Sequence, residues 1–161
     1  MLQKTLAFVL LFFCMQGVVR GQWDKEKKKE TIKDAAFYFE NENYLAALPL
    51  YKELVAHEPK ELEYSMRCGI CYLYKTDEKT KSVQLIEKVL SEAPKTEDVN
   101  FYLGRAYHLN SRFNDAIEQF NLAKQKKTSK KNKELIGLYV DYCNNAKELT
   151  EHPVNVSIEN I

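Results

Sequence analysis

Apolar positions recur along the chain at helical spacing and, on a longer scale, with a period of about 34 residues. Small residues mark the register, and a tyrosine follows each of them by three positions: Ala35 with Tyr38, Gly69 with Tyr72, and Gly104 with Tyr107. Other positions stay in step, such as Ala47, Ser82 and Ala116. A period of this length indicates stacked helical hairpins, because each hairpin buries its apolar face only against a neighbour.

Each repeat predicts two helices separated by a turn, since apolar residues return every three or four positions. The expected helices span 31–40, 45–56, 64–74, 82–90, 101–109 and 113–123, and residues 24–30 form a charged lead-in. Pro49 is expected in the first turns of its helix, where a missing N–H is tolerated. Pro59 and Pro94 end the first two hairpins. Gly69 and Gly104 inside helices indicate a close helix crossing, a role that Ala35 takes in the first repeat.

A seventh helix is expected over 133–150, after a lysine-rich turn at 124–133 that we interpret as solvated. Its buried stripe is predicted to contain Leu135, Leu138, Tyr139, Tyr142, Cys143, Ala146 and Leu149. The opposite face is polar, as the end of a helical stack requires for solubility. The sequence therefore predicts a capping helix.

Both ends of the chain lie outside this pattern. Lys4 precedes a short apolar run at 6–13, and Val19-Arg20-Gly21 offers a cleavage site before Gln22, the layout of a secretory signal peptide. The run is shorter than the roughly 20 residues that a membrane span needs. At the other end, Val154, Val156 and Ile158 alternate with polar residues, which is a strand pattern. We therefore expect a signal peptide at 1–21, a repeat domain at 22–150 and an extended tail at 151–161, in an exported protein.

Charge excludes one class of function. The whole chain has 24 basic and 23 acidic residues, and cleavage would remove Lys4 and Arg20, leaving 22 against 23 and a net charge of −1. A nucleic-acid-binding domain carries a strongly basic face, which this balance argues against. No stretch after Gln22 is apolar enough to cross a membrane. The expected partner is a protein or peptide, because stacked helical hairpins present an extended binding surface.

These positions resemble the tetratricopeptide repeat. The third unit matches best, in Leu103–Tyr107 (LGRAY) and Phe113–Ile117 (FNDAI). The first unit has Ala35 in place of glycine, the second has Ser82 in place of alanine, and no unit carries the early tryptophan of the motif. The resemblance implies an all-α fold, a right-handed superhelical stack of three hairpins plus a cap. It also implies that the first helices line a concave face where partners bind.

A second, looser resemblance concerns the end of the chain. The segments 144–149 (NNAKEL), 153–156 (PVNV) and 158–160 (IEN) are similar to a junction in some envelope proteins of the Bacteroidetes. Those proteins continue from a repeat region into a β-propeller and an OmpA-like domain. The resemblance implies a periplasmic or outer-membrane-associated protein. The chain is then either a stand-alone relative or a truncated remnant of a larger envelope protein.

The repeat resemblance also supplies candidate binding residues. Its concave positions fall, among others, on Phe39, Met66, Ile70, Tyr74, Phe101, Arg105 and His108. Aromatic, methionine and arginine side chains are enriched in interface cores. The same residues equally fit packing between hairpins, and both interpretations stay open. Ile32 and Ala36 stand where some family members place residues that grip a C-terminal carboxylate, which argues against that clamp here.

Cys68 and Cys71 form the one motif with possible chemistry, a C-x-x-C pair. In a thioredoxin-like setting it would be redox-active, but here it lies within a predicted helix, where small packing residues are the simpler interpretation. His57, His108 and His152 are far apart in sequence and suggest no metal site. We therefore predict a non-enzymatic interaction scaffold without cofactor or metal. The alternative is a thiol-redox or metal-binding protein that uses Cys68 and Cys71.

Overall fold

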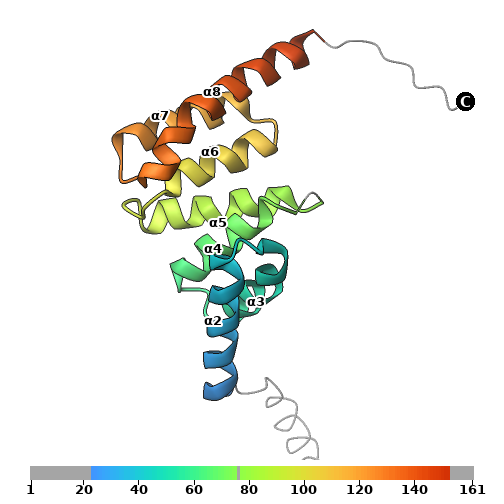
Figure 1. Cartoon of the computed structure of the whole chain (residues 1–161), viewed down its shortest axis with the longest axis vertical. Coiled ribbons are helices and arrows are strands. Elements are labelled where there is room, and N and C mark those ends of the chain that lie inside the picture. Colours follow the sequence, from blue (N-terminus) through green and yellow to red (C-terminus); the bar gives the residue numbers. More distant parts are fainter. Residues whose placement is uncertain (1–22, 76, 153–161) are drawn as a thin grey trace, which may run out of the picture.

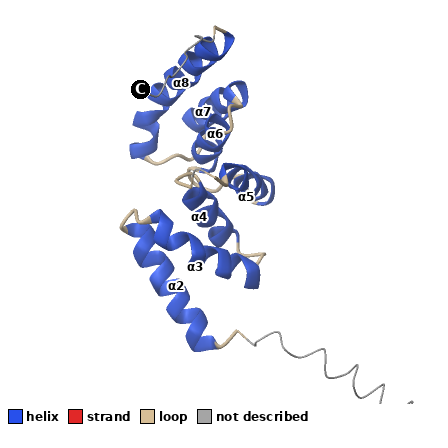
Figure 2. Ribbon diagram, turned by 90° about the vertical axis from the view of Figure 1, so that its right-hand side faces the viewer, coloured by secondary structure: helices blue, strands red, loops and turns tan. Residues whose placement is uncertain are grey.

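The computed structural model describes residues 23–75 and 77–152, and every regular element in these ranges is an α-helix (Figure 1). The helices follow in chain order as α2 (Lys25–Glu40), α3 (Tyr44–His57), α4 (Leu62–Tyr72), α5 (Lys79–Glu92), α6 (Val99–Leu109), α7 (Phe113–Gln125) and α8 (Lys130–Glu151). Consecutive helices pack against each other, so the hairpins α2/α3, α4/α5 and α6/α7 form one stack that α8 closes (Figures 1 and 2). The predicted all-α stack of three hairpins plus a terminal helix is confirmed.

The first helix is longer than the sequence pattern indicates. Residues 25–30, predicted as a lead-in, are the first turns of α2. The side chain of Asp24 accepts a hydrogen bond from the N–H of Glu26 and caps the helix. The Lys27 ammonium lies 2.8 Å from the Glu53 carboxylate of α3. Apolar periodicity misses this segment because charged side chains hold it, and Lys and Glu are good helix formers.

The turns within the first and third hairpins share one backbone conformation. Glu42 follows α2 with a φ of 56°, and Ser111 follows α6 with a φ of 59°. A residue in this left-handed region ends a helix and reverses the chain. Both turns lie where the sequence places them, and Pro49 is the sixth residue of α3.

The close helix crossings predicted at the small residues are present. A Cβ atom added to Gly104 would lie 2.7 Å from Cε1 of Phe120, and one added to Gly69 would lie 2.7 Å from Cγ1 of Ile86. Ala35 is fully buried at the equivalent place. The first and second helices of each hairpin therefore approach too closely for a larger side chain.

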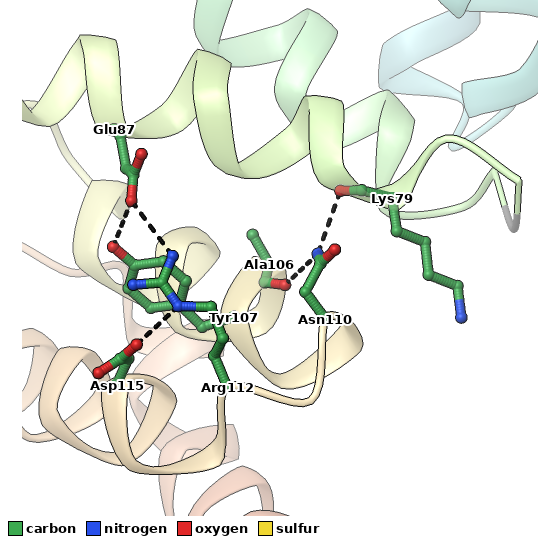
Figure 3. Close-up of polar contacts among 7 residues, drawn as sticks. All are labelled: Lys79, Glu87, Ala106, Tyr107, Asn110, Arg112 and Asp115. Carbon is green, nitrogen blue, oxygen red and sulfur yellow. Dashed lines mark hydrogen bonds and ion pairs between the residues drawn. The ribbon is translucent and has the colours of Figure 1, made fainter.

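Hairpins two and three are joined by polar side chains as well as by packing (Figure 3). The amide nitrogen of Asn110 donates 3.2 Å to the carbonyl of Lys79 in α5 and 2.8 Å to that of Ala106. Arg112 donates 2.6 Å to Asp115 in the first turn of α7. These contacts fix the turn between α6 and α7 against the preceding hairpin.

The terminal helix α8 packs on α7 and, less extensively, on α6. It buries Ile136 and Cys143, and Tyr139 stacks on Phe120 with ring centroids 5.5 Å apart. Part of the predicted buried stripe is not buried: Leu138, Tyr142 and Leu149 are 45%, 46% and 69% exposed. They are exposed because helices pack against α8 on one side only. The apolar stripe in the sequence is wider than the side of α8 that these helices cover.

Candidate functional site

The first helices of the three hairpins, α2, α4 and α6, surround a cavity of about 640 Å³. Its apolar lining comes from all three repeats. Three predicted site residues, Phe39, Met66 and Ile70, belong to this lining. The complete lining is Phe39, Leu62, Glu63, Met66, Arg67, Ile70, Val89, Thr96, Glu97, Asp98 and Tyr102.

Arg67 is the one cation in this lining, and three neighbours hold it. One guanidinium nitrogen donates 3.1 Å to the Tyr51 hydroxyl, and another lies 2.8 Å from the Glu63 carboxylate. The guanidinium carbon lies 5.1 Å from the ring centroid of Phe39. Arg67 therefore ties α4 to both helices of the first hairpin and fixes one wall of the cavity.

The acidic side chains at the rim also have partners. The Glu97 carboxylate lies 3.1 Å from the Lys127 ammonium, and Asp98 accepts a 2.8 Å hydrogen bond from the backbone N–H of Ser129. Paired surface charges contribute little net energy to an encounter. What the cavity offers a ligand is mainly its apolar floor.

An aromatic row continues from this cavity toward α8. The rings of Tyr44 and Tyr74 stack with centroids 4.2 Å apart, and the Tyr44 centroid lies 5.4 Å from that of Phe39. The Arg105 guanidinium carbon then lies 5.3 Å from the Tyr74 ring and 5.4 Å from the Tyr139 ring. Burial, followed by the neighbouring Tyr74, raises the pKa of the Tyr44 phenol. We define the aromatic row as Tyr44, Tyr74, Arg105 and Tyr139.

Two predicted site residues lie elsewhere. Phe101 is 1% exposed and packs against Phe120 and Tyr139, with ring centroids 5.9 and 5.6 Å away. It is a core residue, and its neighbour Tyr102 lines the cavity instead. His108 packs near Phe113, with centroids 5.7 Å apart. Burial, followed by the nearby Arg105, lowers the pKa of His108.

Sequence reasoning missed Arg67, Tyr102 and Tyr44. A signal for Arg67 is present, because Glu63 precedes it by one helical turn and such pairs stabilise a helix surface. Tyr102 is adjacent to the chosen Phe101, and one residue turns a helical side chain by about 100°. Tyr44 opens the second helix of its hairpin, a position outside the first-helix rule that guided the selection.

The three cysteines in the described part of the chain are free and buried. Burial raises the pKa of the Cys68 and Cys71 thiols to about 12 and that of Cys143 to about 11. A reactive cysteine has a depressed pKa and access to solvent. Cys68 and Cys71 thus behave as the small packing residues that a helix crossing needs. In residues 23–75 and 77–152, His, Cys, Asp and Glu side chains form no group of three that could hold a metal ion.

Comparison with solved structures adds a neighbour of the same architecture. The chain is similar to the crystal structure of the Sgt2 TPR domain from Aspergillus fumigatus, with a TM-score of 0.59 over 84% of this chain and 88% of that one. The chain has the fold of a tetratricopeptide-repeat domain. At 14% identity the likeness concerns the fold.

The sequence comparisons give no closer relative of this repeat domain. No family model matches the chain, and no curated protein matches it. Among the residues that the structure describes, no helix combines the length and apolar character required to cross a membrane.

Proposed function

We propose that this repeat domain is a non-enzymatic interaction scaffold that binds a segment of a partner protein on its concave face. The observation that carries the proposal is the cavity of about 640 Å³ between α2, α4 and α6, with Phe39, Met66 and Ile70 in its lining. An apolar hollow with a few fixed polar groups suits an anchoring side chain of a partner.

The chemistry of the surface favours an apolar or aromatic anchor. Glu63, Arg67 and Glu97 already have charged partners, so a ligand gains most by covering the apolar floor. Tyr74, the second member of the aromatic row, is 43% exposed. Its ring would receive the residues that follow the anchor along the groove.

The test combines binding with a site-specific probe. Residues 22–161, with a photo-crosslinking amino acid in place of Tyr74 or of Glu118, would be incubated with extract of the source organism. Glu118 is exposed on α7, the second helix of its hairpin, and serves as the matched control. The proposal expects one partner crosslinked from position 74 and lost when Tyr102→Ala removes a wall of the cavity.

Circular dichroism checks that each variant stays folded. A partner crosslinked equally from both positions, and retained by Tyr102→Ala, would place binding outside the concave face and contradict the proposal. The same crosslinked partner would identify the process that the scaffold serves.

We further propose that the protein is exported and works in assembly of the cell envelope. The support is the signal-peptide pattern at 1–21 and the similarity of segments 144–149 and 153–160 to envelope proteins. Both segments 1–22 and 153–161 lie outside the described residues. N-terminal sequencing of the protein from its source tests export: a chain that begins at Gln22 supports it, and a chain that retains Met1 contradicts it.

A further inference from the structure

The helix α8 leaves an apolar stripe uncovered by the residues that the structure describes. Leu138, Tyr142 and Leu149 are 45%, 46% and 69% exposed. They follow one another at four and seven residues, which places them along one side of a helix. A stack ends in a polar face when nothing covers it. This stripe therefore indicates a surface that is covered in solution.

The buried side of α8 is a different side of the helix from the exposed stripe. Ile136 and Cys143 are fully buried, and Tyr139 packs on Phe101 and Phe120 of the third hairpin. The stripe is thus a second apolar side of the same helix. The side chains of the stripe are too exposed to belong to the hydrophobic core.

The two ends of α8 carry charges of opposite sign, and Glu134, Asp141 and Lys147 lie between them. Lys130, Lys131 and Lys133 lie in the first turn, and Glu148 and Glu151 lie in the last turns. This order opposes the helix dipole, which favours acidic residues at the start and basic residues at the end. An antiparallel second copy of α8 would place the glutamates of one helix beside the lysines of the other.

The register of such a pair is consistent with the stripe. A two-fold axis near residue 140 brings Leu138 of each copy opposite Tyr142 of the other. The same register places Leu149 over the aliphatic stem of Lys131. It brings Glu148 within two residues of Lys130, which is about 3 Å along the helix axis. Lys131 also lies 3.2 Å from Glu42, but both side chains are largely exposed and leave room for a neighbour.

We propose that two copies of this chain associate through their α8 helices, packed antiparallel with the stripes of Leu138, Tyr142 and Leu149 facing each other. The contact uses one helix from each copy, so it is small for a protein interface and the dimer is weak. A dissociation constant on the order of 10 to 100 μM is expected.

Analytical ultracentrifugation of residues 22–161, which contain every described helix, tests the proposal. Between about 1 and 300 μM the chain should pass from monomer to dimer. Leu138→Glu with Tyr142→Glu should leave a folded monomer throughout this range. Glu118→Lys changes the charge of an exposed residue of α7, outside α8, and should leave the dimer unchanged.

Charge reversal tests the antiparallel register. Lys130→Glu and Glu148→Lys should each weaken self-association about tenfold or more, because like charges then face each other across the contact. An equimolar mixture of the two variants carries opposite charges at both facing pairs. It should form a heterodimer about as tightly as the unmodified chain associates with itself.

Several outcomes would overturn the proposal. The proposal is wrong if the chain is a monomer at the highest concentration. It is also wrong if the dimer survives the double substitution in the stripe. Association that appears only after removal of residues 153–161 would assign the stripe to that segment of the same chain. Two single variants that fail to pair with each other would exclude the antiparallel arrangement.

Discussion

The hydroxyl of Tyr107 donates a 2.6 Å hydrogen bond to the carboxylate of Glu87 (Figure 3). Tyr107 belongs to α6 and Glu87 to α5, so the bond joins the third hairpin to the second. The Arg112 guanidinium lies 4.0 Å from the Tyr107 ring centroid and 3.6 Å from the same Glu87 oxygen. One carboxylate therefore receives a phenol and a cation from the next repeat.

Replacing Tyr107→Phe should lower the free energy of unfolding by about 1 to 2 kcal/mol, because a hydrogen bond to a charged acceptor is lost. Urea denaturation followed by circular dichroism measures the change. Tyr38→Phe is the control: Tyr38 holds the same repeat position, and its hydroxyl has no hydrogen-bond partner within the described residues. Equal effects of the two substitutions would argue against a structural role for the Glu87 contact.

The same contact predicts a pH dependence. Burial, followed by the bond to Glu87, raises the pKa of Tyr107 to about 12. An unfolded tyrosine has a pKa of about 10, so this phenol stabilises the fold fully below pH 10 and loses that contribution as the pH rises toward 12. Unfolding free energies of the wild type and of Tyr107→Phe should therefore converge between about pH 10 and 12. A constant difference across this window would contradict the shift.

Gly104→Ala should destabilise the domain by up to about 2 kcal/mol net. The new methyl group meets the fully buried ring of Phe120, and overpacking costs about 1 to 3 kcal/mol, against a helix-propensity gain of about 1 kcal/mol. Gly137→Ala in α8 is the matched control, since nothing lies within 4 Å of the added Cβ. Thermal melting should show a lower midpoint for the first variant and a higher midpoint for the second.

The fold was predictable because its constraints are local and repeated. The small residues Ala35, Gly69 and Gly104 predict close helix crossings. In the structure Gly69 and Gly104 each lie against a side chain of the neighbouring helix, and Ala35 is fully buried. The lead-in at 25–30 was missed because ion pairs to α3, rather than apolar burial, hold it. Apolar periodicity does not detect a helix end held in this way.

The site was less predictable because the packing of the neighbouring helices decides which residues of a helix are buried and which line the cavity. Phe101 and Tyr102 differ by one position, yet the first fills the core and the second lines the cavity. The tilt of α6 against α7 and α8 decides between them, and the sequence of α6 alone does not carry that information. The burial of the α8 stripe was predicted wrongly for the same reason, because its apolar spacing is also that of a buried helix.

The thiols should be inert in the folded protein. With pKa values of about 12 for Cys68 and Cys71 and about 11 for Cys143, the thiolate is scarce at pH 8. Ellman's reagent should react with residues 22–161 slowly under native conditions and with three thiols after denaturation. A rapid native reaction at Cys68 or Cys71 would revive the thiol-redox alternative for this chain.

Arg105 provides a test of whether the aromatic row is structural or free for a partner. Its guanidinium lies between the Tyr74 and Tyr139 rings and donates 3.3 Å to the Tyr74 hydroxyl. Cation–π contacts at exposed sites contribute about 0.5 to 1 kcal/mol each, so Arg105→Ala should lower the free energy of unfolding by about 1 kcal/mol. A double-mutant cycle with Tyr139→Leu should return a coupling of about 0.5 kcal/mol or more. If Arg105→Ala leaves stability unchanged but weakens binding of the crosslinked partner, the guanidinium serves binding. Loss of stability with unchanged binding means that Arg105 links α6 to α8 and to the turn that follows α4.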